Sequence, residues 1–221
     1  MAIYCKNYTS AGDFPHVVRQ LQQGAAEDAA SPGEGRAWVI VRFSASVERL
    51  PREGERVTLE TWAGESRHAF YPRYYRLLSG EGRELLRASS LWVVLDVKER
   101  TMLTASLPAL RGGTVTGHEL PLPGVIKMPA GEEIGAFTVP PEYIDGNGHM
   151  NNARYFDLAE TVINGRGEIK SAVIEFTAEA LEGDTILLHR SWRGEEYFLE
   201  GTVGGKRCFR LKETFKNISC G

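Results

Sequence analysis

The chain has 221 residues, of which 42% are apolar and 25% are charged, the composition of an ordinary globular protein. Its net charge of −3 argues against a dedicated nucleic-acid-binding protein, which would be strongly basic. Proline, glycine and charged residues interrupt every apolar run well short of the roughly 18 residues that a membrane-spanning helix needs, so we expect no membrane span.

The N-terminus and the cysteines favour a reducing, cytoplasmic location. The first residues, MAIYCKNYTSAGDF, have neither the basic start nor the long apolar core of a signal peptide. Cys5, Cys208 and Cys220 show no metal-binding spacing such as CxxC, and reduced thiols are the simplest interpretation. The P-loop and GxGxxG patterns of nucleotide-binding proteins are absent. We therefore expect no metal and no cofactor.

The first half of the chain begins with a helical pattern. Apolar residues from Phe14 to Ala25 recur at helical spacing and predict a helix over roughly Phe14–Ala26. Strand-like segments follow at Trp38–Val47, Glu53–Trp62 and Gly80–Val94. A stretch rich in proline and glycine, Ala105–Glu133, then suggests a linker.

The second half repeats this order. Tyr155, Leu158, Ala159 and Val162 predict a second helix over roughly Asn152–Asn164. Strand-like segments again follow, at Ser171–Ala180, Glu182–Trp192 and Gly204–Ile218. A helix with one apolar face must bury that face against another element. The repeat therefore predicts an α+β protein of two units, residues 1–125 and 126–221, each with an antiparallel sheet wrapped around one long helix.

Polar groups that can carry chemistry gather just before the second helix, in the segment YIDGNGHMNNARY. Asp145, Asn147 and His149 alternate along it, and Asn151 and Asn152 follow. Backbone N–H groups at a helix start are unpaired and point outward. Such a place can bind a carbonyl oxygen and hold a water beside it. The last two asparagines suit the N-cap of the helix rather than catalysis.

Each of these residues also has a purely structural interpretation. His149 can be a turn histidine that donates to a backbone carbonyl. Asn147 lies between Gly146 and Gly148 and suits a left-handed turn position. Asp145 can cap the same turn, and its most direct functional part is to orient Asn147 or His149. The residues alone leave these alternatives open.

The tandem order of elements, together with the string DGNGHMNNARYFDLAE, resembles the acyl-ACP thioesterase family of double hot-dog proteins. That family carries D-x-N-x-H-x-N-N before its second hot-dog helix, which this chain matches with Asp145, Asn147, His149, Asn151 and Asn152. The family also carries a glutamate on the next strand, in an apolar-E-aromatic-x-x-E pattern. The matching residues are Ile174, Glu175, Phe176 and Glu179.

Two features refine the resemblance. Plant members have a cysteine after the strand glutamate, but this chain has Ala180, which puts a cysteine mechanism in doubt. The absence of a long N-terminal extension resembles a bacterial-type member. The fold implied is a tandem hot-dog, and the activity implied is hydrolysis of the thioester of acyl-[acyl carrier protein].

The resemblance implies a catalytic set of Asp145, Asn147, His149 and Glu179. A buried Glu179 would hold and deprotonate a water. His149 would share that proton or deliver it to the thiolate, and the Asn147 amide would face the carbonyl oxygen. From periodicity alone, Glu179 would be an ordinary solvent-facing strand residue. Glu160, on the second helix, is a reserve candidate.

The two halves are not chemically equivalent. If Phe43–Ser46 is aligned with Phe176–Glu179, Ser46 takes the place of the glutamate, and the first half has no Asn-x-His pair before its helix. We therefore expect residues 126–221 to form the catalytic hot-dog domain and residues 1–125 to shape the acyl tunnel.

The implied partner is an acidic acyl carrier protein, and a homodimer of such chains fits the same resemblance. An arginine-rich run suits an acidic partner, although a solvated strand face explains it equally well; it contains Arg67, Arg73, Arg76, Arg83 and Arg87. Three alternatives stay open: an acyl-CoA thioesterase, a hot-dog dehydratase or hydratase of 3-hydroxyacyl or enoyl thioesters, and a non-catalytic acyl-binding module.

Overall fold

The computed structural model describes residues 3–10, 12–104, 107, 118–163 and 167–216. The chain divides into two compact units, 1–123 and 124–221. No helix within the described ranges has the length and apolar character that a membrane crossing requires.

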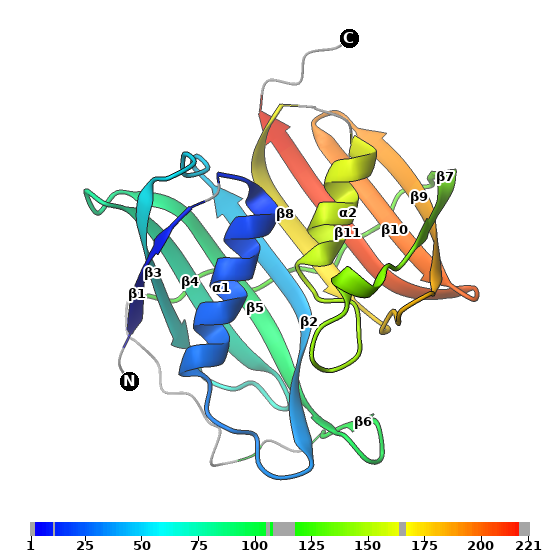
Figure 1. The fold of residues 1–221 in the computed structure, drawn as a ribbon, viewed down its shortest axis with the longest axis horizontal. Helices are drawn as coiled ribbons and strands as arrows, with labels where there is room; N and C mark the ends of the chain where they lie inside the picture. The colour runs from blue at the N-terminus through cyan, green and yellow to red at the C-terminus, as the bar shows by residue number, and fades with distance from the viewer. Residues whose placement is uncertain (1–2, 11, 105–106, 108–117, 164–166, 217–221) are drawn as a thin grey trace. The chain divides into compact units, whose positions relative to one another are not determined.

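Unit 1 is an antiparallel sheet with the strand order β1-β3-β4-β5-β2, and the long helix α1 lies against this sheet (Figure 1). The short strand β6 pairs with the far end of β5. The elements are β1 (Tyr4–Thr9), α1 (Phe14–Asp28), β2 (Arg36–Val47), β3 (Arg56–Ala63), β4 (Tyr71–Ser79), β5 (Glu84–Asp96) and β6 (Thr101–Met102).

Helix α1 forms where the apolar periodicity predicts it. The Asp13 side chain accepts a hydrogen bond from the His16 N–H at 2.7 Å and so caps the first turn. The predicted apolar residues from Phe14 to Ala25 are all buried. A Cβ atom on Gly24 would lie 2.4 Å from Leu59 Cδ2, so the glycine lets the helix approach β3 closely.

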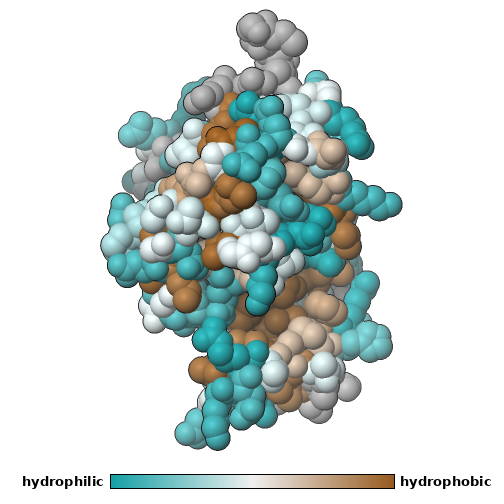
Figure 2. All heavy atoms as spheres, turned by 90° about the vertical axis from the view of Figure 1, so that its right-hand side faces the viewer, coloured by the Kyte–Doolittle hydropathy of each residue, from teal (hydrophilic) through white to brown (hydrophobic). Residues whose placement is uncertain are grey.

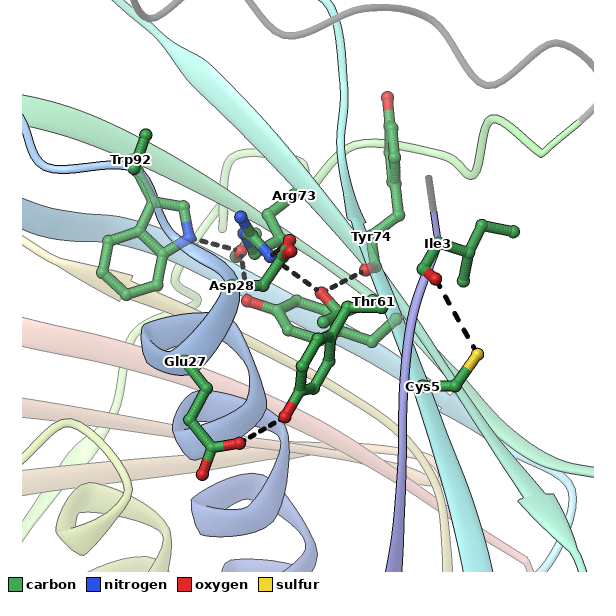
Figure 3. A network of polar contacts seen from close by, with 12 residues as sticks. Ile3, Cys5, Glu27, Asp28, Thr61, Arg73, Tyr74 and Trp92 are labelled. Atoms are coloured by element: carbon green, nitrogen blue, oxygen red, sulfur yellow. Dashed lines mark hydrogen bonds and ion pairs between the residues drawn. The ribbon is translucent and has the colours of Figure 1, made fainter. Parts of the chain in front are cut away.

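A buried polar network ties the end of α1 to the sheet of unit 1 (Figure 3). Arg73, only 8% exposed, reaches from β4 to Asp28, the last residue of α1, with Nη1 2.8 Å from Oδ2. The same Nη1 donates to Thr61 Oγ1 on β3 at 3.2 Å. Because an unpaired buried charge is costly, the ion pair fixes where the helix ends against these two strands.

The arginine-rich run of unit 1 does not form one basic surface. Arg73 and Arg76 are three residues apart on β4, and side chains alternate between the two faces of a strand. Arg76 pairs with Glu60 at 2.8 Å, on the face opposite Arg73. Arg83 and Arg87 pair with neighbouring glutamates on their own hairpin. Much of the positive charge in the run is therefore neutralised within unit 1.

Unit 2 repeats the connectivity of unit 1. Its strand order is β7-β9-β10-β11-β8, again antiparallel, and α2 lies against the sheet (Figure 1). The elements are β7 (Glu132–Thr138), a 3-10 turn η2 (Pro141–Tyr143), α2 (Arg154–Ile163), β8 (Glu168–Phe176), β9 (Thr185–Arg193), β10 (Glu196–Val203) and β11 (Lys206–Lys216).

The shared connectivity confirms the predicted α+β fold of two sheet-and-helix units. In both units the helix follows an edge strand and precedes the strand at the opposite edge. The turns into β3 and β9 place Gly54 and Gly183 at φ of +76° and +78°, a conformation that suits glycine.

The sequence patterns missed five strands of the described residues: β1 and β7, which precede the helices, the interior strands β4 and β10, and the short β6. The predicted linker also extends too far, because its last two residues, Glu132 and Glu133, already belong to β7. Glu132 pairs with Arg190 of β9 in the ladder and through an ion pair of 2.9 Å. Most residues of β7 are exposed. The side of the molecule that carries this strand is covered mostly by hydrophilic side chains, with apolar side chains between them (Figure 2). An exposed edge strand lacks the apolar alternation by which strands are recognised.

Helix α2 packs on its sheet through aromatic rings. Tyr155, in the first turn, meets Phe176 of β8 and Phe209 of β11 edge to face, with centroids 5.3 and 4.9 Å apart. The helix begins at Arg154, two residues later than predicted, and the predicted end at Asn164 lies outside the described residues.

A carboxyl group is buried beneath α2. Glu213 on β11 is 3% exposed, and its ladder partners are Ala172 and Tyr197. Burial, together with the smaller effect of the negative charge of Glu160 on α2, raises the pKa of Glu213 to about 8. The folded protein therefore keeps this carboxyl protonated where the unfolded chain would ionise it.

This burial predicts a pH-dependent stability. Between pH 4.5 and about 8 the folded state binds more protons at Glu213 than the unfolded state, so stability should fall as pH rises. The slope is at most about 1.4 kcal/mol per pH unit. Glu213→Gln removes this term, so its advantage in melting temperature over the parent should be larger at pH 8 than at pH 5. The exposed Glu195→Gln is the control, and parallel pH curves for parent and Glu213→Gln would contradict the assignment.

Candidate active site

The D-x-N-x-H motif forms a tight hairpin loop between η2 and α2. Ile144 and Met150 form a β-bridge across its base. The Asp145 N–H donates to the His149 carbonyl at 2.9 Å, and Gly148, at φ +81°, closes the turn back to the Asp145 carbonyl at 3.0 Å. Backbone hydrogen bonds therefore hold His149 at the end of a closed loop.

Asp145 stabilises this loop from inside. Its Oδ1 accepts a hydrogen bond from the backbone N–H of Asn147 at 2.8 Å, the arrangement of an Asx turn. The turn interpretation of Asp145 thus describes its observed contact, which orients the main chain of Asn147.

The loop passes into α2 through Asn151. The Asn151 Oδ1 accepts from the Ala153 N–H at 2.9 Å, and its carbonyl accepts from the Arg154 N–H at 2.9 Å. Asn151 therefore closes the turn that leads into the helix. It is not the predicted N-cap residue, because the helix begins three residues later, at Arg154.

Glu179 lies in a bend beyond β8 and not on the strand, which corrects the prediction. β8 ends at Phe176. The next two amides, of Thr177 and Ala178, both point at the Cys208 carbonyl, with N–O distances of 2.9 and 3.3 Å. Two amides that share one carbonyl cannot continue a ladder of regular register, so the chain turns away from β11 before it reaches Glu179.

The loop and the bend meet, and they bring two predicted residues together. The Met150 N–H donates to the Ala180 carbonyl at 2.8 Å. One residue earlier in each segment, His149 Nε2 lies 3.0 Å from Glu179 Oε2. The two side chains are 28% and 33% exposed, so the expectation of a buried glutamate is wrong.

The other predicted residues lie apart from this pair. Asn147 is exposed on the loop, and its side chain makes no hydrogen bond with another residue in the described part of the chain. Glu160 is exposed on α2. Ser46 remains inside β2, opposite Arg87, whereas β8 has already ended at the aligned position of Glu179.

Sequence reasoning missed an aromatic clamp at the base of the loop. The Arg154 guanidinium lies over the Tyr143 ring, 4.9 Å from its centroid, and pairs with Asp157 at 3.1 Å. The Tyr143 carbonyl accepts from the Asn151 N–H at 2.8 Å. Tyr143 and Arg154 lie on either side of the motif in sequence. Only their contact in the folded structure shows that they brace the loop. Within the described ranges, no three His, Cys, Asp or Glu residues gather as a metal-binding group.

Comparison with known families gives a match in each unit of the chain. The acyl-ACP thioesterase N-terminal domain matches residues 17–106, and the acyl-ACP thioesterase C-terminal domain matches residues 127–203. The chain belongs to the acyl-ACP thioesterase family. The second match contains the whole loop, α2 and Glu179.

This chain has two plant proteins among its relatives. It is 30% identical over 162 residues to a chloroplastic dodecanoyl-[acyl-carrier-protein] hydrolase of Cinnamomum camphora, covering 64% of this chain and 41% of that protein. It is 28% identical over 130 residues to a chloroplastic palmitoyl-acyl carrier protein thioesterase of Cuphea hookeriana, covering 53% and 31%. The matches span less than half the length of either relative.

Solved structures show the hot-dog fold. An acyl-ACP thioesterase from Bacteroides thetaiotaomicron superposes with a TM-score of 0.82 at 18% identity, covering 97% of this chain and 98% of that one. A 12:0-ACP thioesterase from Umbellularia californica gives 0.79 at 18% identity, covering 97% of each chain. A MaoC-like dehydratase from Phytophthora capsici gives 0.60 at 12% identity, covering 99% and 96%.

The Asx turn predicts separable effects at position 145. Asp145→Ala removes the acceptor of the Asn147 N–H, so exchange of that amide should accelerate by about tenfold, the worth of one hydrogen bond. Asp145→Asn keeps an acceptor oxygen and should stay within about threefold of the parent. Amide exchange by NMR measures both variants. Equal acceleration in the two would show that the charge of Asp145, and not its acceptor, holds the loop.

Proposed function

We propose that this protein hydrolyses the thioester of acyl-[acyl carrier protein] and releases a free fatty acid and the carrier thiol. The observation that supports the proposal is the 3.0 Å contact between His149 Nε2 and Glu179 Oε2, formed by the D-x-N-x-H loop of a member of this family. The plant relatives carry names of the same activity.

The pair suits attack by water on a thioester. Glu179 takes a proton from the water as its oxygen bonds to the acyl carbonyl carbon, and the carbonyl oxygen becomes an oxyanion. When the tetrahedral species collapses, the carbon–sulfur bond breaks and His149 delivers a proton to the departing thiolate. Glu179 then passes the proton taken from water to His149 across their 3.0 Å contact, which restores both groups. The partial exposure of both side chains leaves room for water at the pair.

Asn147 is our candidate for the oxyanion donor. Its side chain is exposed on the loop that holds His149, and its main chain is oriented by Asp145. A single donor of this kind is typically worth about 2.7–4 kcal/mol in the transition state. Asp145 then contributes by shaping the loop, without contact with the reacting atoms.

We assign catalysis to the second hot-dog domain and the shaping of the acyl tunnel to the first, with the boundary near residues 125 and 126. In support, Asp145, Asn147, His149 and Glu179 all belong to unit 2. The exposed Ser46, on a continuous strand of unit 1, has no comparable loop beside it in sequence.

The proposed partner is an acyl carrier protein, and the proposed compartment is the cytoplasm. The free thiols of Cys5 and Cys208 fit reducing conditions. Burial raises the pKa of the Cys208 thiol to about 11, which fits an inert core residue. A homodimer of two such chains stays a prediction that light scattering can test.

The activity is tested by thiol release from matched carriers. Acyl-ACP and acyl-CoA substrates of several chain lengths, with 3-hydroxyacyl and enoyl counterparts, should give the highest kcat/KM on a saturated acyl-ACP. A preference for CoA would identify an acyl-CoA thioesterase. Hydration or dehydration without thiol release would identify the dehydratase alternative, and no reaction on any carrier would overturn the enzymatic proposal.

Glu179→Gln tests the mechanism. The variant keeps the shape of the side chain and removes the base, so turnover should fall by roughly 10²–10⁴ while the fold is retained. Glu182→Gln, an exposed change three residues away, is the matched control and should leave turnover unchanged.

Ser46→Ala should also leave turnover near that of the parent if only the second domain is catalytic. A loss of a hundredfold or more in Ser46→Ala would assign chemistry to the first domain. Near-normal turnover of Glu179→Gln would shift the base to Glu160 or Asp145.

A further inference from the structure

One peptide unit joins the glutamate bend to the histidine loop. Its carbonyl belongs to Ala180 and accepts from the Met150 N–H at 2.8 Å. Its N–H belongs to Leu181 and donates to Asp184 Oδ2 at 2.8 Å. Met150 directly follows the histidine of the proposed pair, and Ala180 directly follows the glutamate. The peptide unit is therefore held at both ends, by the histidine loop and by the Asp184 side chain.

Asp184 is itself fixed by the backbone. Its N–H donates to the Leu181 carbonyl at 3.1 Å, and its carbonyl accepts from the Val139 N–H at 2.9 Å. The Gly183 N–H donates to the Val139 carbonyl at 3.0 Å. Val139 is 1% exposed and directly follows β7. The carboxyl group therefore reaches the Leu181 N–H from a turn that is anchored beside a buried residue.

Glu179 lies between two backbone anchors of the bend. On one side, the Ala178 N–H is the last to reach the Cys208 carbonyl of β11, at 3.3 Å. Along the described chain, the next hydrogen bond between backbone groups is the one from Met150 to the Ala180 carbonyl. A shift of this second anchor therefore moves the Glu179 side chain with it.

Unit 1 contains the same bend without the glutamate. The N–H groups of Glu48 and Arg49 share the Leu85 carbonyl of β5, with N–O distances of 3.0 and 3.3 Å. In unit 2 the two amides before Glu179 share one carbonyl of β11 in the same way. The residue that follows Arg49 is Leu50. A leucine therefore occupies the place in unit 1 that Glu179 occupies in unit 2.

An acidic side chain also closes the next turn in both units. In unit 1 the Arg52 N–H donates to Glu55 Oε2 at 2.9 Å, and the Glu55 N–H donates to the Arg52 carbonyl at 3.0 Å. Ser10 exchanges two backbone hydrogen bonds of 2.8 and 3.0 Å with this turn, as Val139 does in unit 2. The chain therefore offers the same turn beside a bend that lacks the glutamate, which is an internal control.

We propose that Asp184 is a positioning residue of the active site, which keeps Glu179 in contact with His149. It acts through the peptide unit between Ala180 and Leu181, without contact with the reacting atoms. A carboxylate that accepts a backbone N–H makes a charge-assisted hydrogen bond, which is roughly twice as strong as a neutral one. This bond also polarises the peptide unit and strengthens its carbonyl as an acceptor. The inference rests on the proposed function for its catalytic consequence, because Glu179 is the proposed base.

The kinetic test compares Asp184→Ala with Glu55→Ala. Asp184→Ala should lower kcat by about 10- to 100-fold with KM within about threefold, because a displacement of about 1 Å can cost up to roughly 10² in rate. Glu55→Ala removes the matching acceptor of unit 1 together with an ion pair to Arg49 at 2.7 Å, and should leave kcat near that of the parent. Equal losses in the two variants would overturn the inference.

Asp184→Asn separates the hydrogen bond from general packing. The variant keeps an acceptor oxygen, but the bond is no longer charge-assisted and is weaker. Its kcat should therefore lie between those of the parent and Asp184→Ala, and a kcat no higher than that of Asp184→Ala would contradict the proposal. If Asp184→Ala fails to fold, Asp184→Asn provides the test, and a kcat equal to that of the parent would then overturn the inference.

A double variant tests whether the effect passes through the base. Adding Asp184→Ala to Glu179→Gln should cause little further loss, because the base has already been removed. Losses that multiply would show that Asp184 supports the protein independently of Glu179, which would reject the positioning role.

Amide exchange tests the peptide link without any substrate. Asp184→Ala should accelerate exchange at Leu181 and at Met150 by about tenfold. Glu55→Ala should accelerate exchange at Arg52 alone. A turn that served only its own stability would change Leu181 and leave Met150 unchanged, and that result would overturn the link.

A crystal structure of Asp184→Ala measures the positioning directly. The distance between His149 Nε2 and Glu179 Oε2, 3.0 Å in the parent, should increase by about 1 Å. An unchanged distance would overturn the inference even if the enzyme is active. An increased distance, in a protein whose parent releases no thiol from any carrier, would retain the positioning role and reject the proposed function.

Discussion

The site depends on the packing of α2 against β8 and β11. The edge-to-face contacts of Tyr155 with Phe176 and Phe209 fix the first turn of the helix on the two strands. The loop before the helix and the bend after β8 are then forced to the same end of the unit. The backbone bond from Met150 to Ala180 can form only because of this placement. Hydrophobic packing thus sets the distance between His149 and Glu179, which are thirty residues apart in sequence.

The two units show how one topology is used in two ways. Unit 1 has the same order of strands and helix, but the buried polar network at the end of α1 joins Arg73 to Asp28 and Thr61. That network satisfies its own charges and fixes the helix to the sheet. In unit 2, His149 and Glu179 meet in a partly exposed position, where water can reach them. The difference lies in exposure and in the loop before the helix, and not in the fold.

Polar groups within the units differ in how they are accommodated. The Arg73 charge is paired with the Asp28 carboxylate, and this attraction offsets part of the desolvation cost of burying the guanidinium. Glu213 instead stays protonated beneath α2, at a cost to stability that grows with pH. The Cys208 thiol donates to the Gly201 carbonyl at 3.1 Å and behaves as a core side chain. None of these groups belongs to the proposed reaction.

The sequence by itself determined the two helices, six of the eleven strands in the described residues, and the family. Apolar periodicity locates α1 and α2 because a buried helix face repeats every three to four residues. The motif from Asp145 to Asn152 is a continuous stretch of sequence. The loop that it forms, and the helix that follows, could therefore be recognised from residues that are neighbours along the chain. The edge strands β1 and β7 escaped recognition because exposed edges carry weak alternation.

Only the tertiary structure decided what lies beside His149. Whether Glu179 lies on the strand or beyond it depends on how two amides share the Cys208 carbonyl, which no local pattern encodes. The backbone hydrogen bond from Met150 to Ala180 likewise joins two segments that are distant in sequence. A sequence pattern reports contacts between residues that are near along the chain, whereas this site is built from contacts that exist only after the helix has packed on its sheet.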